Sequence, residues 1–161
     1  MALTPAQLTT LKNNIIADGT LNALPNNSDG AFAIAIAYNL PASPNFTVWK
    51  TNVSISDVGQ KFNGTELAGL TTLNNTRLQT LAVFLAAGVN PSLPDNRQFF
   101  DDIFSGAGGT NTRANLLALW KRLATRAEKL FATGTGSDPA PATLVVEGAL
   151  SFQDVINARN S

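Results

Sequence analysis

The sequence contains no cysteine and no histidine among its 161 residues. Without cysteine there are no disulfide bonds or thiolate nucleophiles, and the two absences together exclude Ser-His-Asp and Cys-His relays and nearly all zinc sites. Charged residues are also scarce, at 14% of the chain, with 11 basic and 11 acidic side chains and a net charge of zero. This balance indicates neither a strongly basic nucleic-acid-binding protein nor an acidic disordered tail.

Long hydrophobic runs are absent as well. No window approaches the roughly 18 consecutive apolar residues of a membrane-spanning helix, and the first residues lack the pattern of a secretory signal. We therefore expect a cytosolic protein with no membrane contact. The hydrophobic content of 44% is enough to fill the core of one domain. A net charge of zero gives little repulsion between copies, which favours a surface covered by neighbouring subunits.

Capping signals and apolar periodicity predict a mainly helical fold. The motif Thr4-Pro5-Ala6-Gln7 predicts the start of a helix that Gly19 ends. A second helix is expected at residues 28–39, because Pro41 prevents its continuation. The β-branched and aromatic residues at 46–51 predict a loop with a short strand.

Shorter helices are predicted over the middle of the chain, at residues 54–62, 63–70, 72–87 and 92–104. The last of these is expected to begin at a cap formed by Ser92, with Asp95 at capping spacing. Residues 106–110 then form a glycine-rich break that resembles an anion cradle before a helix. No Gly-Lys-Ser/Thr follows it, so a flexible turn between helices is the simpler interpretation.

The longest helix is predicted from about residue 110 to residue 131, with Leu116, Trp120 and Leu123 on one buried stripe. It also carries the only concentration of charge in the chain, formed by Arg113, Lys121, Arg122, Arg126 and Lys129. Two interpretations of this basic helix stay open. It is either a solvated face that offsets the helix dipole, or a contact surface for DNA phosphates or an acidic partner.

The predicted domain organisation is a compact helical domain at residues 1–132 followed by a Gly/Pro-linked C-terminal arm at residues 133–161. A short strand is expected near residues 143–147, and Ser151 with Asp154 predicts a terminal helix. An isolated strand must pair with the edge of another sheet. Four residues are therefore candidates for docking on a partner chain: Leu144, Val145, Val146 and Glu147.

No set of residues has catalytic or metal-binding spacing. The adjacent Asp101 and Asp102 point about 100° apart on a helix, and the other carboxylates are scattered along the chain. Tyr38, Trp49 and Trp120 are interpreted as core residues. We therefore expect no enzyme activity, no cofactor and no bound metal.

Several stretches carry a family resemblance: Phe99–Gly109, Leu119–Gly136, Pro141–Leu144 and Ser151–Val155, together with Trp49–Thr51 and Asn63–Glu66. In these segments the chain resembles structural-module proteins encoded in the virion and morphogenesis genes of tailed bacteriophages. The resemblance covers most of the chain. It implies a role in the phage particle or its assembly and supplies no catalytic residues.

Composition and resemblance together predict a non-enzymatic structural subunit of a tailed-phage particle. The first expectation is a head-tail connector or neck (adaptor) protein, which forms a ring with itself and contacts portal or tail components. A tail completion or tail-associated virion protein is one alternative. A DNA-binding assembly factor that uses the basic helix is the alternative from another class. The expected location is the virion, and the host cytoplasm during assembly.

Overall fold

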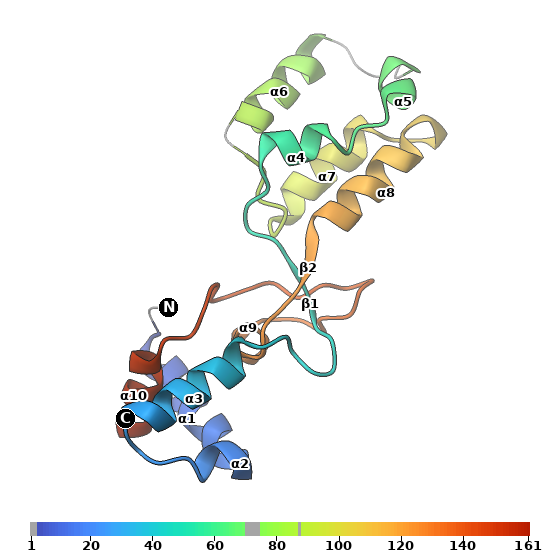
Figure 1. The fold of residues 1–161 in the computed structure, drawn as a ribbon. Helices are drawn as coiled ribbons and strands as arrows, with labels where there is room; N and C mark the ends of the chain where they lie inside the picture. Colours follow the sequence, from blue (N-terminus) through green and yellow to red (C-terminus); the bar gives the residue numbers. More distant parts are fainter. Residues whose placement is uncertain (1–2, 70–74, 87) are drawn as a thin grey trace. The chain divides into compact units, whose positions relative to one another are not determined.

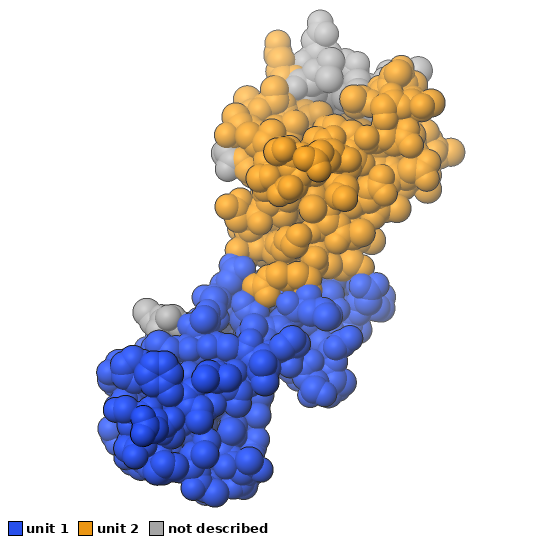
Figure 2. All heavy atoms as spheres, in the orientation of Figure 1, with its two compact units in different colours: residues 1–48, 123–161 blue, residues 49–122 orange. Residues whose placement is uncertain are grey.

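The chain forms two compact units in this computed structural model, which describes residues 3–69, 75–86 and 88–161. Unit 1 consists of Met1–Val48 and Leu123–Ser161, and unit 2 consists of the intervening Trp49–Arg122 (Figure 2). Both units are built mainly from helices joined by loops (Figure 1). The mainly helical fold expected from the sequence is therefore confirmed.

The described helices of unit 1 are α1 (Pro5–Ala17), α2 (Gly19–Asn22), α3 (Ser28–Asn39), α9 (Arg126–Phe131) and α10 (Phe152–Asn160). Those of unit 2 are α4 (Ile55–Gly59), α5 (Gly64–Gly69), α6 (Asn75–Ala86), α7 (Pro94–Ile103) and α8 (Thr110–Leu119), with the 3-10 turn η1 (Ala107–Gly109) before α8. Strands β1 (Thr47–Trp49) and β2 (Lys121–Leu123) pair in a two-stranded sheet. The chain passes from one unit to the other within these two strands.

Several helices begin where the capping signals predict. Thr4 and Gln7 form a reciprocal capping box at α1, so the first exposed amides of the helix have acceptors. The hydroxyl of Ser54 accepts the backbone N–H of Asp57 at the start of α4. The expected helix at residues 72–87 is present as α6, while residues 72–74 and 87 lie outside the described residues.

The first helix ends at Ala17 with Asp18 as its C-cap, directly before Gly19, as the sequence predicts. The Asp18 carboxylate also accepts the backbone N–H groups of Thr20 and Leu21 and so begins α2. One predicted helix start is wrong. Ser92 does not cap α7. Its hydroxyl donates to Asn90, and the helix begins at Pro94, whose fixed φ suits the first turn.

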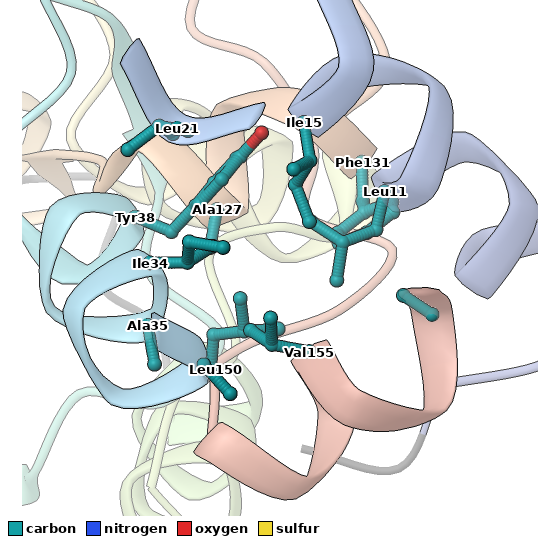
Figure 3. Close-up of a cluster of buried hydrophobic side chains, with 12 residues drawn as sticks. Leu11, Ile15, Leu21, Ile34, Ala35, Tyr38, Ala127, Phe131, Leu150 and Val155 are labelled. Carbon is teal, nitrogen blue, oxygen red and sulfur yellow. The ribbon is translucent and has the colours of Figure 1, made fainter. Parts of the chain in front are cut away.

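The core of unit 1 brings together side chains from both of its chain segments (Figure 3). Helix α10 packs against α1 and α3, and Val155 of α10 is fully buried beside Ile34 and Leu11. The side-chain amide of Asn39 donates to the carbonyl of Leu150 and accepts its N–H, at 2.9 and 2.8 Å. The C-terminal residues are therefore part of the hydrophobic core of unit 1.

The two units do not follow the domain boundary that the sequence predicts between residues 132 and 133. Residues 133–161 belong to unit 1, because Leu150, Val155 and Ala158 complete its core. The guanidinium of Arg159 adds hydrogen bonds to the carbonyls of Leu24 and Pro25. A glycine- and proline-rich loop here joins two parts of one packed unit.

The prediction of a strand near residues 143–147 is wrong, because these residues form no strand. Only Thr143 pairs there, through an isolated antiparallel bridge to Thr133, and Ala142 makes a parallel bridge to Val48. The four candidate docking residues follow as irregular chain: Leu144 and Val146 are half-buried in unit 1, and Val145 and Glu147 are exposed. The apolar run is therefore held by unit 1 without forming a strand.

The single long helix predicted from residue 110 to residue 131 is also wrong. Helix α8 ends at Leu119, β2 follows, and α9 begins at Arg126. Strand β1 needs a hydrogen-bonding partner, and β2 supplies it. Thr125 and Glu128 then form a capping box that starts α9. The spacing of Thr125 and Glu128 is a capping signal in the sequence, but the apolar periodicity of residues 110–131 favoured one continuous helix instead.

The core of unit 2 is aromatic. Phe100, Phe104 and Leu116 are fully buried, and Trp120 packs edge-on against Phe100 with 5.4 Å between ring centroids. Leu116 and Trp120 therefore occupy the predicted core, whereas Leu123, expected on the same stripe, is 52% exposed because it lies in β2. Across the described residues, no helix is both long and apolar enough to cross a bilayer.

Candidate functional site

The most distinctive surface of unit 1 lies on α3. Residues 31–37 of this helix are all apolar, and the sequence carries no charge between Asp29 and Lys50. Its inner side, which includes Ile34 and Tyr38, is fully buried. Its outer side leaves Phe32 53% exposed and Ile36 61% exposed. A helix that is hydrophobic all round is normally buried on every side, whereas the outer side of α3 is exposed to solvent.

Two further side chains extend this surface. Phe152, the first residue of α10, stacks on Phe32 with 4.8 Å between ring centroids and 8° between ring planes. Leu40, directly after α3, is 57% exposed. We name Phe32, Ile36, Leu40 and Phe152 the α3 face. Contiguous exposed apolar surface of this kind marks interaction sites in soluble proteins.

A polar network occupies another part of unit 1. The Arg126 guanidinium pairs with the Asp18 carboxylate at 2.9 Å and lies 4.5 Å from the centre of the Tyr38 ring. The Tyr38 hydroxyl donates to Asn14 at 2.7 Å. The backbone N–H of Leu21 and the Arg126 guanidinium lower the pKa of Asp18 below its ordinary value. This network orients α1, α2, α3 and α9 and therefore has a structural role.

The five predicted basic residues do not share a helix. Arg113 lies in α8, Lys121 and Arg122 lie in β2, and Arg126 and Lys129 lie in α9. Their contacts also differ: Arg113 donates to the carbonyls of Phe104 and Gly106, Arg126 pairs with Asp18, and the Lys129 ammonium lies 5.6 Å from the Phe46 ring centre. The predicted basic helix is therefore wrong, which removes the continuous charged face from which DNA binding was argued.

The glycine-rich turn before α8 does meet a carboxylate, but the carboxylate belongs to the protein. Glu66 accepts the backbone N–H groups of Asn111 and Thr112 at 2.8 Å each. Burial acts to raise the pKa of Glu66, but these N–H donors lower it below its ordinary value. Gly109 is required for packing, since a Cβ there would lie 2.0 Å from the Phe104 carbonyl oxygen. The anion position at this helix end is therefore filled by Glu66.

The remaining acidic residues do not gather into a metal site. Within the described parts of the chain, no three histidine, cysteine, aspartate or glutamate side chains lie close enough together to hold a metal ion. Asp101 and Asp102 lie side by side in α7, and Gln98 donates to Asp102 at 2.8 Å. Tyr38 and Trp120 are buried, as expected, and Trp49 is half-buried.

Comparisons with protein-family models, with curated proteins and with solved structures give no match to this chain.

The α3 face was not among the residues that the sequence interpretation selected as a site. Phe32 and Ile36 were assigned to a helix, and their four-residue spacing looked like an ordinary buried stripe. The signal that pointed to them is the uncharged stretch at residues 30–49, which gives α3 apolar side chains on more sides than one core can cover. The contribution of Phe152 depends on the packing of α10 and was not readable from sequence.

Proposed function

We propose that this protein is a non-enzymatic structural subunit that assembles through the α3 face, and that it serves in a tailed-phage particle as a head-tail connector or neck (adaptor) protein. The α3 face is the observation that supports assembly, because an uncharged apolar surface gains free energy when another chain covers it. The phage context is supported by the sequence resemblance. The proposed location is the virion, after assembly in the host cytoplasm.

The partner proposed for the α3 face is a second copy of the chain. The whole chain has no net charge and the face carries none, so two copies meet without like-charge repulsion. A ring is built by repeating a heterologous contact, so in the proposed ring the α3 face of one copy packs against a different surface of the next copy. A tail completion or tail-associated post uses the same kind of contact and remains the alternative within this class.

The test has two parts. Sedimentation velocity of the full chain should show a concentration-dependent oligomer, and the double variant Phe32→Ser with Ile36→Ser should sediment as a monomer with an unchanged circular dichroism spectrum. Val83→Ser is the matched control, because Val83 is 71% exposed on α6 of unit 2. A wild-type chain that stays monomeric at all concentrations would contradict the role of the face.

The second part concerns the particle. Mass spectrometry of purified phage particles should find the protein at a fixed, ring-like copy number. Its absence from the particles would contradict the proposed virion role. Loss of assembly in the double variant together with absence from particles would favour an assembly factor.

A further inference from the structure

Unit 2 contains a pocket of about 560 Å³ between α7 and α8, within the size range of ligand sites. Its lining residues combine two tryptophans with charged, hydroxyl and small apolar groups: Trp49, Arg97, Asp101, Ser105, Gly106, Thr110, Arg113, Ala114, Leu117 and Trp120. All of them belong to unit 2. We name this set the tryptophan pocket.

The aromatic part of the pocket is held in place by its neighbours. The Arg97 guanidinium lies 4.1 Å from the Trp49 ring centre, and Phe100 packs edge-on against Trp120. Trp120 is only 2% exposed, and its indole N–H is buried with no hydrogen-bond acceptor among the described residues. A buried donor without a partner is uncommon in proteins, which marks this part of the pocket as unusual.

The charged part of the pocket has one uncompensated positive charge. The pocket lining contains the guanidinium groups of Arg97 and Arg113 and one carboxylate, that of Asp101, so the formal charge of the lining is plus one. Arg97 donates to the Pro91 carbonyl, and Arg113 donates to the carbonyls of Phe104 and Gly106. Within the described chain, neither guanidinium has a carboxylate at ion-pair distance. Partial burial of the Arg97 guanidinium lowers its pKa.

These features select among anions. A phosphate carries close to two charges, and the N–H groups of Asn111 and Thr112 at the start of α8, which would add to its binding, already bind Glu66. A carboxylate carries one charge, matches the excess charge of the pocket, and accepts hydrogen bonds from guanidinium groups. The walls formed by Ala114, Leu117 and the tryptophans suit an apolar group beside that carboxylate.

We propose that the tryptophan pocket binds a segment of a partner protein in which a carboxylate side chain stands next to an aromatic or aliphatic side chain. The carboxylate pairs with Arg97 and Arg113, and the apolar side chain packs on Leu117 beside Trp49. The inference goes beyond assembly through the α3 face and uses residues of unit 2 alone.

The chain offers a direct reporter, because it contains two tryptophans and both line the pocket. The two indole N–H signals in a ¹⁵N–¹H spectrum of the full chain can be followed during titration with N-acetylated, C-amidated Gly-Glu-Phe-Gly. Both signals should shift in a saturable way. The matched Gly-Gln-Phe-Gly peptide should bind at least about tenfold more weakly, because it lacks the charge. Inorganic phosphate at about tenfold excess over the peptide should not displace it, because phosphate lacks the apolar side chain that packs on Leu117.

Variants separate the pocket from general adhesion. Arg97→Gln should weaken the acidic peptide about tenfold, and Lys61→Gln, a cation of unit 2 outside the pocket lining, should leave its binding unchanged. If Arg97→Gln fails to fold, Leu117→Asp provides the second variant, since Leu117 is 44% exposed and the new charge repels the peptide. The proposal is overturned if the indole signals do not shift, if the glutamine peptide binds equally well, or if phosphate competes.

The α3 face supplies the control that separates this inference from the proposed function. The double variant Phe32→Ser with Ile36→Ser should bind the acidic peptide as wild type does. A wild-type chain that binds the peptide but does not self-assemble would contradict the α3 face alone. A wild-type chain that self-assembles but does not bind the peptide would contradict the tryptophan pocket alone.

Discussion

Unit 1 is assembled from two chain segments, whereas unit 2 is one continuous segment inserted between them. In unit 1, α10 packs on α1, so its core closes only after residues near both segment ends have met. In unit 2, the helices that pack together lie within one stretch of sequence. Bringing distant segments together costs chain entropy that local contacts do not, so unit 1 depends more on its last residues than their short length suggests.

The two units carry different surfaces. Unit 1 carries the α3 face, an apolar surface without charge, and unit 2 carries the tryptophan pocket, where cations and aromatic rings lie together. The first surface suits burial against a copy of the chain, since it needs no charge complement. The second selects a partner by charge and shape. If both proposals hold, the chain contacts neighbours of two kinds.

The largest expected effect comes from deleting residues 133–161. The deletion removes Leu150, Val155 and Ala158 from the core of unit 1, and each buried aliphatic side chain of the size of leucine contributes about 2–5 kcal/mol. A domain is stable by only about 5–15 kcal/mol, so unit 1 should unfold. The sequence alone had predicted the opposite, a folded domain at residues 1–132.

Hydrogen exchange tests this deletion amide by amide. Amides of α1 and α3 should lose protection, while those of α7 and α8 in unit 2 should keep it. A fragment of residues 49–122 serves as the control and should fold by itself. Protected α1 and α3 amides in the deleted chain would show that residues 133–161 form a separable arm after all.

The next largest effect is expected from Trp120→Ala in unit 2. Removing a buried tryptophan side chain costs about 3–5 kcal/mol, because it leaves a cavity beside Phe100. Leu123→Ala is the matched comparison, since Leu123 was predicted on the same stripe but is 52% exposed, and it should change stability by less than about 0.5 kcal/mol. Urea denaturation of both variants gives the two values. Equal losses would mean that the chain keeps the single long helix that the sequence suggested.

The sequence predicted helix starts better than helix ends. Caps at Thr4, Ser54 and Ser151 depend on side chains within three residues, so local chemistry determined them. The break after Leu119 depends on pairing with β1, whose residues lie far away in the sequence. The periodicity of residues 110–131 could not reveal that pairing, although the box of Thr125 and Glu128 marked where a new helix begins.

The candidate sites show the same limit. The predicted cluster from Arg113 to Lys129 assumed one continuous helix and was lost with it. The uncharged stretch of sequence provided a signal for the α3 face. The stacking of Phe32 on Phe152, however, joins two helices that lie far apart in the sequence. The tryptophan pocket combines residues of α7 and α8 with Trp49, which no spacing rule connects.

A smaller effect is expected from acid. The pKa of Glu66 is lowered in the folded chain, so its ionised form stabilises unit 2 at pH above the ordinary value of 4.5 and this stabilisation is lost as the pH falls below it. Glu66→Gln should lower the melting temperature at pH 7 by less than Trp120→Ala does, and its melting temperature should fall less than that of wild type between pH 7 and pH 3. Thermal melts followed by tryptophan fluorescence measure this directly. Parallel pH profiles would exclude Glu66 as the acid-sensitive group of unit 2.

A small effect is also expected from Arg126→Gln in unit 1, and this variant separates a structural arginine from a binding one. Arg126 and Asp18 are 35% and 28% exposed, and a pair this open to water contributes at most about 1 kcal/mol. The contact with the Tyr38 ring adds about 0.5–1 kcal/mol, the range for a guanidinium that is open to solvent. We therefore expect Arg126→Gln to cost about 1 kcal/mol, and the difference from wild type should shrink in 1 M salt, where the Debye length is about 3 Å.

Arg126→Lys should recover part of the ion pair but less of the ring contact, because an ammonium lacks the planar guanidinium. A double-mutant cycle with Asp18→Asn isolates the pair from the cap that Asp18 provides to α2. If Arg126→Gln left stability unchanged yet abolished binding to DNA or to an acidic partner, Arg126 would be a contact residue of the kind first suggested by its sequence neighbourhood, and the polar network of unit 1 would be secondary to that role.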